Sequence, residues 1–336
     1  MILAGQAKEA IAVAAAALGA GELLGLPTET VYGLAADAEN AVAVARIFGA
    51  KGRPAEHPLI VHVADAATAA QFAGAVPAFA QALMRAFWPG PLTLILPRRA
   101  GVASAAAGGQ DSIGLRCPAH PVARAVLSAC AALTPPVRGL AAPSANLFGR
   151  VSPTTAAHVQ EELGLDLLIL DGGPCAVGIE STIVDCTRGQ PVLLRPGAIT
   201  PVALAAACGE AVLLPQDLAD ATPPAPRASG TLASHYAPRA RVRLFNAAAL
   251  RAALQHEAAQ TADMAVYART LTPTHAALGP AQHWRQMPQT ASDAAQQLFA
   301  VLRELDRTGV AEIWVETPPD TPDWAGVTDR LQRAAA

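Results

Sequence analysis

The chain has 336 residues, of which 52% are hydrophobic and 15% charged, and its formal net charge is −3. This length is sufficient for two domains with separate cores. Because 24 basic residues face 27 acidic ones, the overall charge attracts neither nucleic acid nor an anionic membrane, so any anion site must be local. No apolar run is long enough to span a bilayer and no signal peptide is visible, which predicts a cytoplasmic protein.

Up to residue 215, short apolar runs typical of strands alternate with amphipathic helices. The expected helices cover residues 8–18, 40–49, 77–87, 120–132, 154–163 and 200–208. The expected strands cover residues 21–26, 58–63, 92–97, 110–118, 139–146, 166–173, 180–186, 191–197 and 211–215. Because the last strands follow one another closely, the pattern predicts an α/β domain with a mixed sheet and hairpins.

The segment 216–238 breaks all periodicity and is rich in Pro, Ala, Ser and Thr, which is typical of a linker. Strand-like runs then resume at 241–246, 263–269 and 311–317, with helices expected at 247–258, 291–307 and 324–334. The sequence therefore predicts a first domain over 1–215, a linker over 216–238 and a smaller α/β domain over 239–336.

The cysteines give no indication of a metal or redox site. They occur without a CxxC motif and without Cys/His pairs at zinc spacing, at positions 117, 130, 175, 186 and 208. We expect small buried thiols in a reducing compartment, with no metal ligands from protein side chains and no zinc or organic cofactor.

Six stretches of the first domain end an apolar strand with a compact cluster of polar residues. These stretches are 26–34, 51–63, 111–121, 141–154, 178–185 and 193–199. Ligands of open α/β sheets bind beyond strand ends, where loops converge, so the clusters are expected to share one cleft. Lys51 and the arginines Arg53, Arg116 and Arg195 would suit phosphate and carboxylate groups there.

The catalytic motifs that are absent narrow the chemistry. The sequence has no GxSxG elbow, no HExxH and no nucleophile beside a recognisable base. A site made of positive charge and neutral donors suits acyl-adenylate or phosphoryl chemistry, in which the protein orients the reactants and stabilises spreading charge.

Seven motifs carry a family resemblance. In chain order they are LPTETVYGL, KGRP followed by HPLIVHV, WPGPLTLIL, GLRCP, APSAN, ESTIVD and LLRPGAI. Together they resemble the YrdC-type L-threonylcarbamoyladenylate synthases, and SHYAP with the C-terminal region resembles the long, two-domain form. The resemblance implies a YrdC-like mixed twisted sheet with flanking helices and a smaller Rossmann-like C-terminal domain.

The same resemblance implies an enzyme that makes L-threonylcarbamoyladenylate from L-threonine, bicarbonate and ATP and releases pyrophosphate. Mg²⁺ would accompany ATP. The product would pass to a tRNA threonylcarbamoyl transferase complex that modifies adenosine 37 of tRNAs reading ANN codons, and direct tRNA binding would be weak or absent.

Site residues are carried over from the family motifs position by position. Threonine-binding positions are implied for Thr30, His62, Arg116, Ala142, Ser144 and Ser181. ATP-binding positions are implied for Lys51, Arg53, His57, Ser112, Ser152, Arg195 and Tyr236. Catalytic positions are implied for Lys51, Arg53, Ser144 and Asn146. We further expect the linker to close over the bound nucleotide as a lid, with Tyr236 against it.

Each residue also has an ordinary structural explanation. Arg53 or Arg195 alone would more often be a solvated arginine, Ser152 a helix cap, and Glu29 an exposed side chain. Only the joint order of the motifs favours a functional site.

Two other functions are compatible with parts of the pattern. An RNA-binding module without catalysis could use the same basic residues as a groove, but only 4% of the residues are aromatic. A carbamoyl-adenylate enzyme of metalloenzyme maturation would usually carry zinc-finger and acylphosphatase-like segments, which are not visible.

Overall fold

The computed structural model of the chain describes residues 1–218, 226–230, 234–257, 264–273 and 283–336. They form two compact units, each with its own sheet. The first unit comprises Met1–Phe148 and Ser152–Thr231, and the second comprises Gly149–Val151 and Leu232–Ala336.

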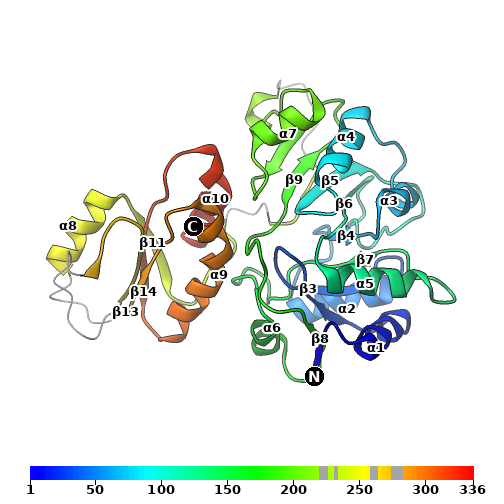
Figure 1. Ribbon diagram of the computed structural model, residues 1–336, viewed down its shortest axis with the longest axis horizontal. Coiled ribbons are helices and arrows are strands. Elements are labelled where there is room, and N and C mark those ends of the chain that lie inside the picture. Colours follow the sequence, from blue (N-terminus) through cyan, green and yellow to red (C-terminus); the bar gives the residue numbers. More distant parts are fainter. Residues whose placement is uncertain (219–225, 231–233, 258–263, 274–282) are drawn as a thin grey trace. The chain divides into compact units, whose positions relative to one another are not determined.

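The first unit is built on a ten-stranded sheet (Figure 1). From edge to edge its strands are β1 (Ile2–Ala4), β8 (Leu168–Asp171), β2 (Leu24–Leu26), β3 (Gly33–Asp37), β7 (Leu140–Ala141), β4 (Ile60–His62), β6 (Ser112–Arg116), β5 (Leu92–Pro97), β9 (Thr182–Asp185) and β10 (Val192–Arg195). The pairs β1/β8, β8/β2, β4/β6 and β5/β9 are parallel. The other neighbouring pairs are antiparallel, which confirms the predicted mixed sheet.

Helices cover the two faces of this sheet unequally. One face packs on a large apolar cluster with α2 (Ala41–Lys51), α3 (Ala66–Phe72), α4 (Ala78–Phe87), α6 (Ala156–Leu163) and α7 (Pro201–Cys208). The other face packs on α1 (Lys8–Gly19) and α5 (Pro121–Ala131), which lie side by side in Figure 1. The strand residues in this second cluster come from β2, β3, β7 and β8, so α1 and α5 cover only part of their face.

The late strands are arranged differently from the prediction. Strand β8 does not join β9 and β10 but pairs in parallel with β1 and β2, because Ile169 and Leu170 are buried on opposite faces of the sheet. Of the three late strands, β9 and β10 pair with each other, in antiparallel orientation. The predicted strand at 211–215 is an isolated bridge between Val192 and Leu213, followed by the short 3-10 helix η1 (Pro215–Asp217). Strands β1 and β3 and helix α3 were not predicted.

The second unit has a four-stranded parallel sheet. Its order is β11 (Arg241–Phe245), β14 (Glu312–Glu316), β12 (Met264–Ala268) and β13 (His283–Gln286). The described part of this unit also contains α8 (Ala247–Glu257), α9 (Ala291–Arg307), η3 (Pro322–Trp324) and α10 (Ala325–Ala334). Parallel strands alternating with helices confirm the predicted Rossmann-like unit. Strand β13 was not predicted because its sequence, HWRQ, is polar and mostly exposed at the sheet edge.

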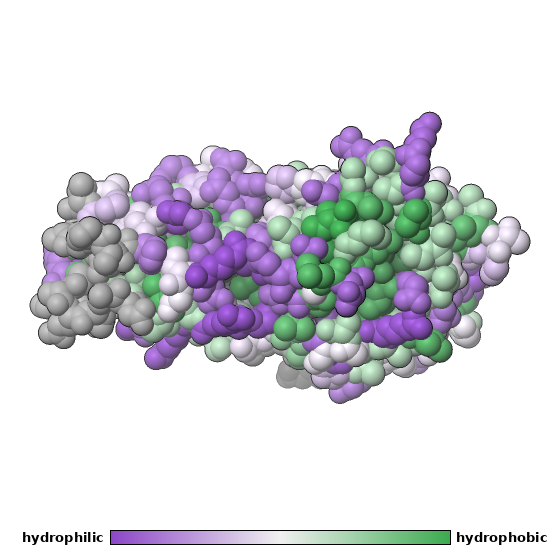
Figure 2. Space-filling model, turned by 90° about the horizontal axis from the view of Figure 1, so that it is seen from below, coloured by the Kyte–Doolittle hydropathy of each residue, from purple (hydrophilic) through white to green (hydrophobic). Residues whose placement is uncertain are grey.

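Apolar side chains gather on one surface of the first unit (Figure 2). Among the described residues, Leu165 is the most exposed large apolar residue, at 73%. A groove of about 550 Å³ is lined by residues of the α1–β2 region, α2, α6 and β8, among them Leu23, Arg46 and Leu163. It contains none of the predicted site residues.

In the described part of the chain, no helix is both long and apolar enough to cross a membrane.

Candidate functional site

Three predicted site residues, His62, Arg116 and Arg195, lie along the face of the first sheet that α1 and α5 leave uncovered. His62 on β4 pairs in register with Arg116 on β6, and Arg116 pairs with Thr93 on β5. Ile183 on β9 pairs with Thr93 of β5 on one side and with Arg195 of β10 on the other. Side chains of residues paired in a sheet point to the same face. The neighbouring strands β4, β6, β5, β9 and β10 therefore present a row of polar groups on one face of the sheet and an apolar core on the other.

Arg116 is the centre of this row and is 4% exposed. Its Nη1 donates to Thr30 Oγ1 at 2.7 Å and its Nε to the Gly90 oxygen at 3.3 Å. Its Nη2 lies 2.7 Å from Glu29 Oε1 in a buried ion pair. Burial would raise the pKa of Glu29, but the charge and hydrogen bonding of Arg116 outweigh burial and leave that pKa below its usual value.

The TET sequence between β2 and β3 shapes the loop that brings Thr30 and Glu29 to Arg116. Thr28 Oγ1 accepts from the main-chain nitrogens of Thr30 and Val31 and donates to the Val31 oxygen at 2.6 Å. Such a hydroxyl turn satisfies the backbone of a buried loop. Three consecutive side chains are thereby fixed in the interior, each at most 8% exposed.

His62 lies beside this cluster as a neutral imidazole. It is 3% exposed, and its Nδ1 has no hydrogen-bond partner among the described residues. Burial, together with the positive charge of Arg116, lowers the pKa of His62 to about 3. An imidazole in this state can accept or donate a hydrogen bond but does not carry charge near neutral pH.

Lys51 anchors the APSAN loop. Gly52, with φ of 61°, ends α2 directly after Lys51. The Lys51 ammonium group donates to the main-chain oxygens of Ser144, at 2.5 Å, and Asn146. Burial and the charge of Arg53 lower the pKa of Lys51 to about 7. Lys51, the first residue of the KGRP motif, thus positions the loop that carries Ser144 and Asn146. The sequence did not predict this contact. Ala142, the first residue of this loop, donates its main-chain nitrogen to the Ile60 oxygen.

Arg53 and Arg195 are buried rather than solvated, at 9% and 2% exposure. Arg195 donates to the Ser181 oxygen from Nε and Nη2 and to Ser181 Oγ at 3.1 Å, and Ser181 Oγ is 2.8 Å from Thr93 Oγ1. Arg53 donates to the Pro58 oxygen at 3.0 Å. The alternative that Arg53 and Arg195 are solvated surface arginines is therefore wrong for both.

Two further predicted ATP contacts have defined surroundings. His57 packs edge-on against Phe148, whose ring also lies 5.8 Å from the Arg53 guanidinium. Ser152 is fully buried and donates to Glu180 Oε1. It does not cap α6, because Thr155 does so by accepting from the His158 nitrogen.

Part of the linker, residues 226–230, belongs to the first unit and lies against the same face. Ser229 donates to the Pro58 oxygen at 2.7 Å, while its main-chain oxygen accepts from Arg195. Arg227 and Gln110 exchange hydrogen bonds. The segment, Ser112 and Ile60 line a cavity of only about 10 Å³. This portion of the linker is therefore packed on the predicted site.

Tyr236 lies in the second unit and is 1% exposed. Its ring packs on Phe299 at 5.4 Å between centroids, and the Arg330 guanidinium lies 5.4 Å from it. The functional roles of Tyr236 and of the site residues in the first unit stay predictions.

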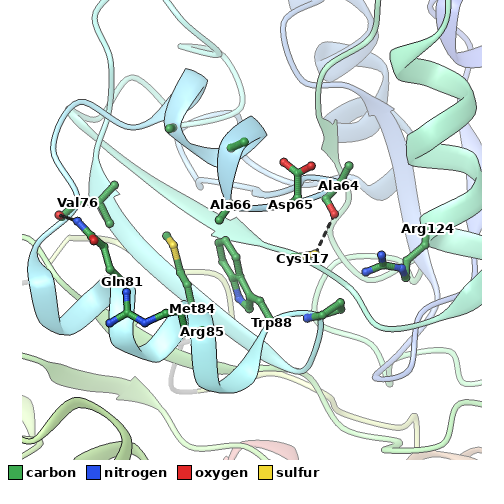
Figure 3. A pocket seen from close by; sticks show the side chains of 13 residues that line it. Ala64, Asp65, Ala66, Val76, Gln81, Met84, Arg85, Trp88, Cys117 and Arg124 are labelled. Atoms are coloured by element: carbon green, nitrogen blue, oxygen red, sulfur yellow. Dashed lines mark hydrogen bonds between the residues drawn. The ribbon is translucent and has the colours of Figure 1, made fainter.

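A larger pocket, of about 610 Å³, opens where β4 and β6 end (Figure 3). Met84 and Trp88 line it, with Arg85 at one end and Arg124 at the other. Cys117, the residue after Arg116, also lines it and donates from Sγ to the Ala64 oxygen at 3.2 Å. Burial raises the pKa of this thiol. The pocket contains none of the predicted site residues.

Sequence reasoning missed several residues that complete the site, namely Glu29, Thr93, Glu180 and Ser229. The sequence offered one indication that Glu29 belongs to the site. Its carboxylate stands between two threonines, in a motif with apolar neighbours. Among the described residues, no group of three or more His, Cys, Asp and Glu side chains is arranged to hold a metal ion.

Two family models match the chain. The model described as "Telomere recombination", which covers the Sua5, YciO and YrdC proteins, matches residues 16–197. The model described as "Threonylcarbamoyl-AMP synthase, C-terminal domain" matches residues 199–336. The chain is 36% identical to the threonylcarbamoyl-AMP synthase of Pyrococcus abyssi, covering 97% of this chain and 94% of the relative. It is 38% identical to that of Bacillus subtilis, covering 97% and 92%.

Solved structures of Pyrococcus abyssi Sua5 are similar throughout. A variant with a histidine and a tyrosine replaced by alanine has a TM-score of 0.87 at 33% identity, covering 100% of this chain and 96% of that one. The complex with L-threonine has a TM-score of 0.84 at 35% identity, covering 97% and 94%.

The large mixed sheet, its arginine-bearing face and the additional parallel sheet define the class of two-domain Sua5-type proteins. The chain belongs to the threonylcarbamoyl-AMP synthase family. A non-catalytic RNA-binding module is not favoured by these comparisons.

Proposed function

We propose that this protein is an enzyme that synthesises L-threonylcarbamoyladenylate from L-threonine, bicarbonate and ATP, with release of pyrophosphate. The observation that carries the proposal is the buried Arg116, which is ion-paired with Glu29 on a face lined by hydroxyls and further arginines. A buried guanidinium in such surroundings suits a substrate carboxylate. Membership in the threonylcarbamoyl-AMP synthase family supports the assignment of this carboxylate to L-threonine.

The two substrates would share the sheet face from β7 to β10. Threonine would lie near Arg116, Thr30 and His62, bordered by the loop of Ala142 and Ser144 and by Ser181. The ATP phosphates would lie near Arg53 and Arg195, the residues that now hold Ser229. Spread positive charge from guanidinium groups suits a polyphosphate.

The reaction balances in two steps. The amine of threonine attacks the carbon of bicarbonate, and loss of water leaves a carbamate. A carbamate oxygen then attacks the α-phosphorus of ATP, and pyrophosphate leaves. In this scheme the protein holds the reactants in line and stabilises negative charge, and Lys51 keeps Ser144 and Asn146 in place.

Mg²⁺ would enter as the ATP complex, held by phosphate oxygens as part of the substrate. The linker would form a lid that excludes water from the reactive mixed anhydride, and Tyr236 would lie against the nucleotide in the closed form. The burial of four of the five free cysteines supports a cytoplasmic location. There the product would be taken up by a tRNA threonylcarbamoyl transferase complex.

Pyrophosphate release tests the function directly. We expect release that requires L-threonine, bicarbonate and Mg²⁺ together, with threonylcarbamoyladenylate identified by mass spectrometry. Release that is undiminished when threonine is omitted would overturn the assignment.

A further inference from the structure

Glu29 is the least expected member of the site. Its carboxylate is buried at 8% exposure and is held from two sides. Oε2 accepts from the Ala119 main-chain nitrogen at 3.1 Å, while Oε1 lies 2.7 Å from Arg116 Nη2. A buried carboxylate is costly unless it is paired and hydrogen-bonded, and Glu29 meets both conditions through Arg116 and Ala119.

Glu29 Oε1 and Arg116 Nη2 form a buried ion pair at 2.7 Å. His62 pairs in register with Arg116 on the neighbouring strand, so its imidazole lies on the same face as this ion pair. The buried His62 Nδ1 lacks a hydrogen-bond partner among the described residues. Buried polar atoms in native proteins are rarely left unsatisfied, so an unpartnered imidazole nitrogen beside a buried ion pair indicates a place for a polar ligand. The ligand must offer a cationic donor to Glu29 and an anionic acceptor to Arg116.

We propose that Glu29 binds the α-ammonium group of the amino-acid substrate while Arg116 binds its carboxylate. An α-amino acid carries its two charged groups on the same carbon, about as close together as the charged atoms of the Glu29–Arg116 pair. Its zwitterion can therefore lie against the pair with each charge facing the opposite one. This inference rests on the proposed function, because it takes threonine as the substrate.

In this role Glu29 determines specificity. Arg116 alone accepts any carboxylate, including that of a hydroxy acid. Glu29 adds a preference for a positive charge on the adjacent carbon, because a neutral hydroxyl there gives the carboxylate no charge to replace the share of Arg116 that the ligand carboxylate takes. The alternative is a structural role, in which Glu29 only ties the TET loop to Ala119 and Arg116.

The test compares two ligands on two proteins by isothermal titration calorimetry at neutral pH. The ligands are L-threonine and its analogue in which the α-ammonium group is replaced by a hydroxyl. The proteins are the wild type and Glu29→Gln, which keeps the shape and the acceptor for Ala119 but removes the charge. Glu39→Gln is the matched control, since Glu39 pairs with Arg138 on the surface.

The wild-type protein and the control variant should bind threonine at least about tenfold more tightly than the analogue. Glu29→Gln should bind threonine at least about tenfold more weakly than the wild type does. It should bind the analogue equally well or more tightly, because Arg116 no longer shares its charge with Glu29. A structural role predicts the opposite for the analogue, with both ligands weakened together, and that result would overturn the inference.

The inference and the proposed function fail in different ways. Wild-type protein that binds no L-threonine would overturn the proposed function itself. Wild-type protein that binds threonine, with a Glu29→Gln variant that keeps the full preference for the ammonium group, would overturn the role of Glu29 alone. If Glu29→Gln does not fold, Glu29→Asp takes its place. The shorter carboxylate should keep the preference for threonine over the analogue but bind threonine more weakly, and loss of that preference would contradict the inference.

Discussion

Arg195 donates from Nη1 to the main-chain oxygen of Ser229 at 2.8 Å, which ties a linker residue to the ten-stranded sheet. The same guanidinium holds Ser181 through three hydrogen bonds. Arg195 therefore joins a proposed threonine contact, the linker and a proposed phosphate position.

Replacing Arg195 by Gln should weaken ATP binding by at least about tenfold, because a charge-assisted contact contributes on the order of 1.5–3 kcal/mol. It should also release the segment 226–230, which hydrogen exchange of that peptide would reveal. Arg99→Gln, which changes an exposed arginine that donates to the Ala70 oxygen, is the control. Unchanged ATP affinity would contradict the phosphate role.

Removing Arg116 should affect both binding and stability. Arg116→Gln should raise the threonine concentration needed for half-maximal activity more than about tenfold, while ATP affinity stays nearly unchanged. It also leaves Glu29 as a buried unpaired carboxylate, which should cost about 3–5 kcal/mol of unfolding free energy. Urea denaturation of Arg116→Gln with and without Glu29→Gln checks this, since the double variant should regain part of the loss. A loss of ATP affinity instead would show that the role is misassigned.

Lys51→Met should loosen the loop of Ser144 and Asn146. The substitution removes two hydrogen bonds from a charged donor without leaving a buried charge, so we expect a destabilisation of about 1.5–3 kcal/mol. Activity should fall further than this destabilisation explains, because the loop carries proposed substrate contacts. Lys8→Met, at a position near the start of α1, is the control. Thermal unfolding and pyrophosphate release measure the two effects, and a fully active variant would be the contrary result.

His62 should make the protein less stable in mild acid. Its pKa is about 3 in the folded protein against an ordinary value of 6.5, so between these values the unfolded chain binds the extra proton. The His62 contribution is fully present above pH 6.5 and is lost as pH falls toward 3, by at most about 1.4 kcal/mol per pH unit. Denaturation measured at pH values above those at which Glu29 titrates should show that the unfolding free energy of His62→Gln falls less steeply with decreasing pH than that of the wild type. An identical slope would place the titration elsewhere.

The sequence predicted the α/β class, most helices and the six polar clusters, because apolar periodicity and motif order depend on local spacing. It did not predict the common face, since strands of three to five residues such as β4 and β6 are too short to show alternation. Register between distant strands, which aligns His62, Arg116 and Thr93, is a tertiary property. The burial of Glu29 depends on Arg116, which lies 87 positions further along the chain, and no local pattern records that pairing.

The position of Lys51 offers a chemical reporter. The sequence contains two lysines, Lys8 at the start of α1 and Lys51 buried beneath the APSAN loop. An amine-reactive reagent should therefore modify Lys8 readily and reach Lys51 only when the loop lifts. With a pKa of about 7, the Lys51 amine would react fast once uncovered. The ratio of labelling at the two lysines would then measure, in one mass spectrum, how often the APSAN loop opens.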